Sequence, residues 1–320
     1  MKVAVVGATG VVGRAIIRCL ETRQFPAQII PLASERSANQ AIQIGNTQVP
    51  VQVLTEKSFN TIDIALFSAG SAVSEQYAPI AVQAGAVVID NTAFFRQHPD
   101  VPLIVPEVNA HVIKTHTGII ANPNCSTAQL VLALKPIHDA YHIKRIVIAT
   151  YQSVSGAGKD AMTALTADTT ALLQSKPVST QSIAFNIVPH IDKFLDTGYT
   201  KEEMKMINEI RKLLDAPTMR ITATCARVPV MIGHSEAVTI ETETPVDPTA
   251  VHALLKTAPG IRVWDPPHYP TPRDCAGQDA VGIGRIRRDF SVDNGIALWC
   301  VGDNLLKGAA LNAVQIAECL

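Results

Sequence analysis

The chain has 320 residues, of which 47% are hydrophobic and 17% charged, and its formal net charge is −1. This length exceeds the usual size of one domain, so we expect two domains that share an interface. The near-zero net charge gives no reason to expect nucleic acid or an anionic membrane as a partner, and no apolar run approaches the roughly 20 residues of a membrane helix.

The six cysteines are scattered without a C-x-x-C pair, and no histidine stands at a zinc-ligand spacing. Unpaired thiols are typical of the reducing cytosol, and this pattern argues against a structural metal. The apolar run at residues 3–6 ends at Gly7 and is too short for a signal peptide. We therefore expect a soluble cytoplasmic protein without a metal site.

The chain begins with the pattern of a nucleotide-binding unit. A strand at 2–6 precedes the glycine-rich stretch 7–13 and a helix that runs to about Leu20. Its glycines would let the backbone turn tightly and approach a pyrophosphate at the helix N-terminus. The spacing is G-x-x-G-x-x-G, not the commoner G-x-G-x-x-G, so a plain strand–helix turn is the alternative.

A second strand, 28–33, ends in Ser34-Glu35-Arg36-Ser37, where a dinucleotide fold meets the adenosine ribose. An acidic residue there selects the 2′-hydroxyl of NAD, whereas an arginine with hydroxyls suits the 2′-phosphate of NADP. Glu35 and Arg36 compete for this role. The flanking serines favour NADP, with a solvated surface loop as the alternative.

Further strands are predicted at 51–54, 62–68, 86–90 and 103–105, with a helix at 74–84. Strands separated by helical patterns indicate a mostly parallel sheet, which binds ligands at the carboxyl ends of its strands. Residues 68–71 and 90–92 lie at such ends. Arg96 follows shortly after and is a candidate anion clamp, with an exposed helical arginine as the alternative.

A strand at 118–121 runs into Asn122-Pro123-Asn124-Cys125-Ser126-Thr127. Leu130, Leu134 and Ile137 recur at the spacing of one helix face, so Cys125 is predicted to be the first residue of a helix. Unpaired N–H groups and the helix dipole would favour its thiolate, which makes it a candidate nucleophile. The alternative is a small buried hydrophobe.

The second half of the chain predicts alternating strands and helices, with some polar residues near the strand ends. Strands are expected at 142–154, 219–229, 236–244, 281–290 and 296–301, helices at 159–174, 200–214, 247–257 and 304–319, irregular chain at 175–189 and a proline-rich loop at 264–274. Gln152 could orient a substrate carbonyl or simply end a strand. Arg227 and His234 flank one connection and can face the same cleft, although a lone histidine is more often structural.

The helix at 200–214 begins with Thr200 and Glu203, which resemble a capping box. Glu202 and Lys205 lie on one side of it. Their default interpretation is an ion pair on a solvated face.

Taken together, these stretches resemble the aspartate-β-semialdehyde dehydrogenase family along essentially the whole chain. The resemblance rests on residues 7–13, 90–92 with Arg96, 105–109, 122–127, 151–158, Glu202 with Lys205, 227–234 and 303–308. It implies an α/β protein, with a Rossmann-type dinucleotide-binding domain (1–124 with 302–320) and an α+β catalytic and dimerisation domain (125–301).

The resemblance also implies a reaction, the reversible NADPH-dependent reductive dephosphorylation of L-4-aspartyl phosphate to L-aspartate-4-semialdehyde on the route to lysine, methionine and threonine. Inorganic phosphate is then a second small-molecule partner, and a homodimer, or a tetramer built from it, is expected. Cys125 would form a thioester, His234 would act as acid/base with an ordinary pKa near 6.5, and Gln152 would hold the acyl group.

The resemblance also assigns individual residues of this chain to substrate and cofactor binding. Arg227 would bind the α-carboxylate, Glu202 the ammonium, and Arg96 and Lys205 with Asn124 the phosphate. The implied NADP contacts are Gly7, Thr9, Gly10, Val11, Val12, Gly13, Ser34, Arg36, Ser37, Ser68, Ala69, Gly70, Ser155, Gly156, Asn304 and Gln315.

The chain departs from the family pattern near the cofactor. Ser71 and Leu306 replace an expected glycine and arginine, and Asn39-Gln40 replaces Gly-Lys. These departures concern nucleotide preference more than thiol chemistry. The rival interpretations are an N-acetyl-γ-glutamyl-phosphate reductase, whose acylated substrate would not need Glu202, and a catalytically idle paralogue that acts as a binding module.

Overall fold

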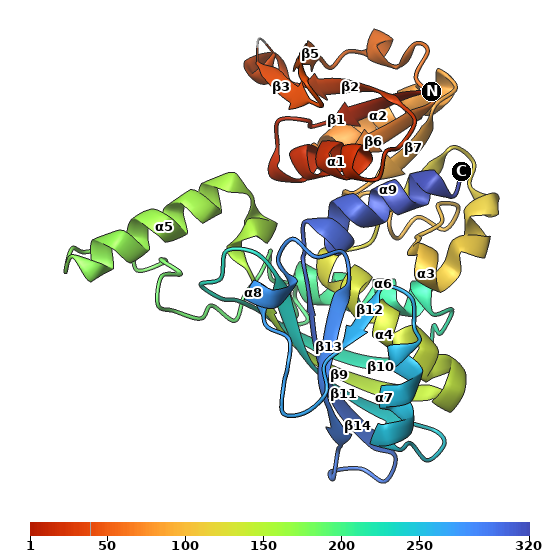
Figure 1. The fold of residues 1–320 in the computed structure, drawn as a ribbon, viewed down its shortest axis with the longest axis vertical. Helices are drawn as coiled ribbons and strands as arrows, with labels where there is room; N and C mark the ends of the chain where they lie inside the picture. The colour runs from red at the N-terminus through yellow and green to blue at the C-terminus, as the bar shows by residue number, and fades with distance from the viewer. Residues whose placement is uncertain (39) are drawn as a thin grey trace. The chain divides into compact units, whose positions relative to one another are not determined.

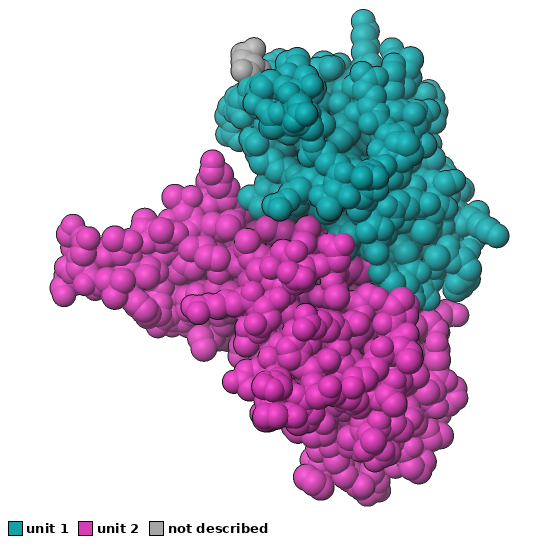
Figure 2. Space-filling view, viewed as in Figure 1, with its two compact units in different colours: residues 1–124, 309–320 teal, residues 125–308 magenta. Residues whose placement is uncertain are grey.

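The computed structural model describes residues 1–38 and 40–320, so the departure at Asn39 lies outside the described residues. The chain divides into two compact units (Figure 2). Unit 1 comprises Met1–Asn124 and Ala309–Leu320, and unit 2 comprises Cys125–Gly308. The second boundary lies after Gly308 and not after residue 301, because strand β14 (Gly295–Gly302) is part of the unit 2 sheet and Gly308 packs against Cys125.

Unit 1 is built on a six-stranded sheet in the order β5-β2-β1-β6-β7-β8. All pairings recorded in this sheet are parallel. The strands are β1 (Lys2–Val6), β2 (Gln28–Ala33), β5 (Gln52–Val53), β6 (Ile64–Phe67), β7 (Val87–Asp90) and β8 (Ile119–Ala121). Strand β6 is buried along its whole length, as expected for a parallel sheet covered on both faces. This is the doubly wound architecture predicted from the alternation of strands and helices.

The helices of unit 1 come from both ends of the chain. They are α1 (Val11–Thr22), α2 (Ser71–Gln83), α3 (Pro106–Asn109) and α9 (Leu311–Glu318), with short 3₁₀ turns at Glu35–Ser37, Glu56–Phe59 and Ala110–Thr115. Helix α9 packs against α1, and the Asn312 side chain in α9 donates to the Ile104 carbonyl at 2.9 Å.

Unit 1 differs from the sequence-based expectation in two places. Residues 103–105 form no strand, and only an isolated bridge links Leu103 to Ala121. A hairpin that was not predicted, β3 (Ala41–Ile44) and β4 (Thr47–Pro50), is joined by Gly45 and Asn46. Gly45 has a φ of +55°, which glycine adopts without strain.

Unit 2 contains a mixed six-stranded sheet in the order β10-β9-β11-β14-β13-β12 (Figure 1). The strands are β9 (Ile143–Gln152), β10 (Arg220–Arg227), β11 (His234–Thr242), β12 (Ile261–Val263), β13 (Val281–Arg288) and β14 (Gly295–Gly302). Strand β12 was not predicted. Strand β11 starts two residues earlier than expected, so His234 is its first residue and not part of the connection.

The helices of unit 2 are α4 (Cys125–Tyr141), α5 (Lys159–Leu173), α6 (Lys201–Leu213), α7 (Pro248–Lys256) and α8 (Pro272–Cys275), with a 3₁₀ turn at Val154–Ala157. A π-helix at Leu306–Ala310 includes the last residues of unit 2 and the first two residues of the C-terminal segment of unit 1. Helices α4, α6 and α7 contact the sheet, whereas α5 extends away from it (Figure 1). Along β11 the even-numbered residues are buried and several odd-numbered ones are partly exposed. The sheet therefore has one face under helices and one open face. Within the described residues, no helix is both long and apolar enough to cross a membrane.

Candidate active site

Cys125 is the first residue of α4, as predicted. Its side chain is partly exposed. Gly308 leaves room for it, because a Cβ at residue 308 would lie 2.9 Å from the Cys125 Cβ, closer than side-chain atoms approach. The thiol is therefore held at the start of a helix, where backbone N–H groups and the helix dipole favour a negative charge.

Three other cysteines of unit 2 are buried in surroundings that disfavour a thiolate. Burial raises the pKa of Cys275 to about 11, and it raises the pKa values of Cys225 and Cys300 as well. Among these thiols, Cys125 alone combines partial exposure with a helix N-terminus. This contrast makes Cys125 the candidate nucleophile among them.

His234 is completely buried, and its Nδ1 accepts a hydrogen bond from the Ser153 backbone N–H at 3.1 Å. Because a backbone amide can only donate, Nδ1 carries no proton and Nε2 carries one in the neutral ring. Nε2 has no hydrogen-bond partner within the protein. It therefore carries a proton for which the protein supplies no acceptor.

The expectation of an ordinary His234 pKa is wrong. Burial, and secondly the positive charge of Arg227, lower its pKa from 6.5 to about 3. The ring is thus neutral at physiological pH. The sequence could not predict this, because both causes arise only in the folded chain.

Asn304 fixes the backbone around His234. Its Oδ1 accepts from the Ser153 and Ser155 hydroxyls at 3.1 and 3.0 Å and from the Gly233 N–H at 2.9 Å. The contacts of Asn304 and Ser155 with the cofactor stay a prediction, whereas their hydrogen bonds to each other and to neighbouring residues are present in the structure. Ser153, which contacts both His234 and Asn304, was missed as a site residue although it lies in the stretch 151–158.

Arg227 ends β10 and lies next to His234. Its Nη1 donates to the Ser153 carbonyl at 2.7 Å. A Cβ at residue 156 would lie 3.1 Å from that nitrogen and 3.3 Å from His234 Nε2, so Gly156 leaves room for both side chains. Cys125 and Glu202 are near enough to favour the charged form of the guanidinium, against a burial effect that lowers its pKa.

Glu202 and Lys205 do not form the solvated pair that their spacing suggested. Glu202 is 5% exposed, and its Oε1 lies 3.4 Å from Gln152 Nε2. Lys205 Nζ lies 3.1 Å from Glu202 Oε2 and 2.7 Å from Asp192 Oδ2. These carboxylates raise the pKa of Lys205 against the opposing effect of burial, so the ammonium stays charged. The predicted capping box of Thr200 and Glu203 is present.

Arg96 and Asn124 belong to unit 1, and both are buried. Arg96 is not the exposed helical arginine considered above: its Nε donates to the Asn122 carbonyl at 2.8 Å and an Nη to the Asn91 carbonyl at 2.7 Å. These bonds fix the guanidinium at the carboxyl ends of β7 and β8, the edge at which parallel sheets bind ligands.

Unit 1 contains a cavity of about 910 Å³ at the carboxyl ends of β1, β2 and β6. Its lining includes eight of the predicted cofactor residues, namely Gly7, Thr9, Gly10, Ser34, Arg36, Ser37, Ser68 and Ala69. Glu35, Thr55, Glu56 and Tyr77 also line it. Thr55, Glu56 and Tyr77 were missed, although Thr55 and Glu56 directly follow a predicted strand.

The glycines of this cavity form a cradle suited to a pyrophosphate. Gly7 has a φ of +86°, and a Cβ at residue 13 would lie 2.2 Å from the Gly7 carbonyl oxygen. Gly10 caps α1 without a side-chain hydrogen bond, which leaves the first N–H groups of the helix for an anion. A dinucleotide therefore fits this site.

Five predicted cofactor residues of unit 1 do not line the cavity. Val11, Val12 and Gly13 belong to the first turn of α1, and Gly70 is the N-terminal cap of α2. Gln315, in α9, donates from Nε2 to Glu107 Oε1 at 3.0 Å. Gly13 contributes to the cradle because it allows α1 to pack closely against the Gly7 carbonyl.

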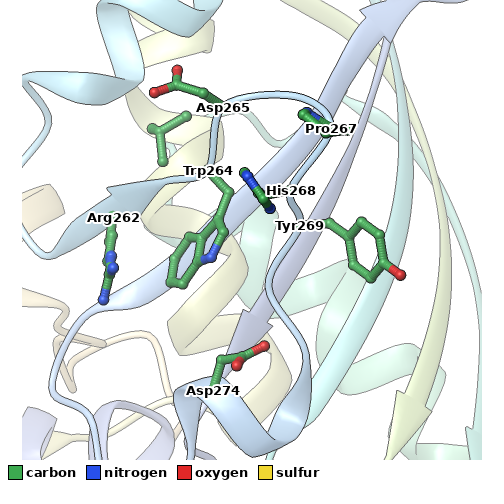
Figure 3. A pocket seen from close by; sticks show the side chains of 8 residues that line it. Arg262, Trp264, Asp265, Pro267, His268, Tyr269 and Asp274 are labelled. Atoms are coloured by element: carbon green, nitrogen blue, oxygen red, sulfur yellow. The ribbon is translucent and has the colours of Figure 1, made fainter.

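A separate surface cavity of about 580 Å³ lies in unit 2 (Figure 3). It is lined by residues that were not predicted as site residues: Arg262, Val263, Trp264, Asp265, Pro267, His268, Tyr269 and Asp274. Its charged groups already have partners within the chain. Arg262 stacks on Trp264 at 4.4 Å, and Asp265 pairs with His252 and Lys256. We assign no ligand to it.

Within the parts of the chain that the structure describes, no group of three or more His, Cys, Asp or Glu residues could hold a metal ion.

Comparison with known proteins agrees with this geometry. The model of the semialdehyde dehydrogenase NAD-binding domain matches residues 2–116, and that of the semialdehyde dehydrogenase dimerisation domain matches residues 134–307. An aspartate-semialdehyde dehydrogenase of Legionella pneumophila is 50% identical over all of this chain and 95% of its own length.

Solved structures of aspartate-semialdehyde dehydrogenases are also similar to this chain. The crystal structure of aspartate semialdehyde dehydrogenase II from Vibrio cholerae, complexed with ASA, matches with a TM-score of 0.98 and 49% identity, covering 100% of this chain and 97% of that one. The enzyme from Candida albicans, solved with NADP, matches with a TM-score of 0.80 and 27% identity over 100% of this chain and 98% of that one. The chain therefore belongs to the aspartate-semialdehyde dehydrogenase family.

Proposed function

We propose that this chain catalyses the reversible NADPH-dependent reductive dephosphorylation of L-4-aspartyl phosphate to L-aspartate-4-semialdehyde, in the biosynthesis of lysine, methionine and threonine. The observation that carries the proposal is the arrangement in unit 2 of a helix-terminal cysteine with Arg227 and a neutral His234 whose Nε2 is unpartnered. Unit 1 would bind the dinucleotide, and unit 2 would supply catalysis and the dimer interface.

In the biosynthetic direction the Cys125 thiolate attacks the acyl carbon, and inorganic phosphate leaves as the thioester forms. Bound NADPH supplies the hydride of the reaction. Reduction of the thioester places negative charge on the oxygen of the Cys125-bound carbon, and a hydrogen bond from His234 Nε2–H stabilises that charge. Collapse of the thiohemiacetal then releases the aldehyde and regenerates the thiolate.

A neutral His234 changes the role expected from the sequence. A ring with a pKa of about 3 is a poor store for an extra proton at pH 7, whereas its Nε2–H is a good hydrogen-bond donor in a buried site. Gln152, buried beside Glu202, would hold the acyl group. We therefore assign His234 to oxyanion stabilisation and to proton transfer concerted with bond breaking.

Substrate recognition follows from the charges. Arg227 would bind the α-carboxylate with two parallel hydrogen bonds, and the buried Glu202 would accept from the ammonium group. Arg96 and Lys205, with Asn124, would hold the dianionic phosphate, which needs more than one positive partner. Lys205 is suited to this because its pKa is raised and its charge persists.

The cofactor assignment rests on the cavity in unit 1. Arg36, between Ser34 and Ser37, would bind the 2′-phosphate of NADP, and the α1 N-terminus would face the pyrophosphate. The structure of the Candida albicans relative with NADP supports the same choice. Ser155, Gly156 and Asn304 would contribute from unit 2.

A homodimer is proposed on the open face of the unit 2 sheet. Tyr151 is 37% exposed there, and its ring centroid lies 5.6 Å from that of Trp299. Ala237 pairs with Trp299 on β14, and these two residues line a mostly apolar hollow together with Pro270 and Pro272. A hydrophobic sheet face of this kind suits an obligate interface. None of the six cysteines forms a disulfide in the described chain, which supports a cytoplasmic location.

The test is an assay of NADP reduction with L-aspartate semialdehyde that depends on phosphate or arsenate, run with and without a thiol-alkylating reagent. We expect turnover that alkylation abolishes. Cys125→Ala should remove turnover while NADPH binding stays nearly intact. Retained activity in this variant would rule out the thioester mechanism. Preferred turnover of N-acetylglutamate semialdehyde would support the rival reductase, and the absence of all turnover would support a binding module.

A further inference from the structure

A buried acid, Glu236, lies beside the site and has no role in the mechanism above. It follows His234 by two residues on β11, so both side chains lie on the helix-covered face of the sheet. Glu236 is 0% exposed, and neither carboxyl oxygen receives a hydrogen bond if the group is treated as a carboxylate. A buried, unpaired carboxylate would be very costly.

The groups around Glu236 are neutral or themselves acidic. Gln129 from α4 and Cys300 from β14 lie within hydrogen-bonding reach of the carboxyl group, and Thr150 is its neighbour on β9. The Cys225 thiol on β10 is also close enough to interact with it. Burial raises the pKa of Glu236 well above its usual value, against the smaller opposing effects of Gln129 and Cys300. The group is then a neutral acid with one O–H to donate.

The side-chain oxygen of Gln129 lacks a hydrogen-bond donor. It lies one helical turn after Cys125, and its Nε2 donates to the His234 carbonyl at 3.1 Å. Its Oε1 is buried and receives no hydrogen bond. Gly302 leaves room for this group, because a Cβ at residue 302 would lie 2.7 Å from Oε1. A protonated Glu236, whose carboxyl group lies near the Gln129 side chain, would supply the donor that this oxygen lacks.

We propose that Glu236 is a positioning residue, which donates to Gln129 and thereby locks the nucleophile helix to the start of β11. The link runs from Glu236 through the Gln129 amide to the His234 carbonyl, and it joins the element that carries Cys125 to the element that carries His234. This inference rests on the proposed roles of those two residues.

Substitutions at residue 236 can remove its hydrogen-bond donor while its side-chain volume is nearly kept. Glu236→Gln keeps the shape and a donor, so kcat should stay within about twofold of wild type. Glu236→Leu keeps the bulk but leaves Gln129 Oε1 without a donor, and Gln129→Leu removes the link from its other side. Each should lower kcat about tenfold with little change in KM, because a small displacement of reacting groups slows the chemical step.

The experiment combines steady-state kinetics with the alkylation rate of Cys125 by iodoacetamide, which needs no substrate. The double variant Gln129→Leu/Glu236→Leu should be no slower than either single variant, because all three break the same link. Val238→Ala, on the same face of β11, is the matched control: it should lower the thermal unfolding midpoint with kcat and the alkylation rate unchanged.

Three results would overturn the inference: wild-type kcat and alkylation in Glu236→Leu, equal damage in Glu236→Gln and Glu236→Leu, or losses in the double variant that multiply. Should the wild-type chain show no turnover of L-aspartate semialdehyde, the proposed function fails. The alkylation rates then decide the positional link by themselves, since they should fall severalfold in Glu236→Leu and remain unchanged in Glu236→Gln.

Discussion

The buried neutral state of His234 predicts how stability should respond to acid. Its pKa is about 3 in the folded chain against 6.5 for an unperturbed histidine. Above pH 6.5 the ring is neutral in both folded and unfolded states and contributes nothing to the pH dependence. As the pH falls from 6.5 toward 3, only the unfolded chain takes up the proton, so stability is lost progressively.

The magnitude follows from these two values. Between pH 7.5 and pH 5 the unfolded histidine gains about 2 kcal/mol of protonation free energy that the folded ring does not share. His234→Asn removes this term, and its side-chain oxygen can still accept from the Ser153 N–H. The difference in free energy of unfolding between wild type and this variant should therefore shift by about 2 kcal/mol against wild type over that interval.

The measurement is urea unfolding of both proteins at pH 7.5 and pH 5, together with an NMR titration of labelled histidines. We expect one imidazole whose signals do not move down to pH 5 in wild type and are missing from His234→Asn. A histidine that titrates near 6.5 and disappears with the substitution would refute the reasoning. So would a stability difference that is constant between the two pH values.

Other changes test the remaining contacts. Arg227→Lys should raise KM for the semialdehyde about tenfold, because a point charge cannot reproduce the planar fork, and an unchanged KM would contradict its carboxylate role. Arg36→Ala should raise KM for NADP about tenfold with little effect on NAD; parallel losses for both nucleotides would place the 2′-phosphate elsewhere. Gly308→Ala should lower kcat about 10- to 100-fold by displacing Cys125, with near-wild-type circular dichroism, and undiminished kcat would show that the thiol tolerates the shift.

The sequence predicted those features that local patterns determine. Cys125 could be placed at a helix start because the strand before it and the apolar spacing after it both lie within a few residues. The glycine cradle was also readable, since the strand, the turn and the helix are consecutive. The hairpin at β3 and β4 could have been predicted as well. Gly45-Asn46 is a recognised two-residue turn, and the residues on either side of it alternate in polarity as strands do.

Features that depend on distant segments could not be read in this way. Glu202 looked like half of a solvated ion pair because spacing along a helix does not reveal which side is buried. The pKa of His234 depends on its burial in the folded chain and on the charge of Arg227, which comes from another strand, β10. The contact of Gln129 with the His234 carbonyl joins residues 105 positions apart, so no local signal marks it.

The order of the two units along the chain also affects the order in which they can complete folding. Unit 2 is one uninterrupted segment, whereas unit 1 needs residues 309–320 to complete it. Helix α9 is largely buried, and its Asn312 donates to the Ile104 carbonyl. On the ribosome, the inserted segment can finish folding while the first-made domain still waits for its closing helix. The part translated first is consequently the part that matures last.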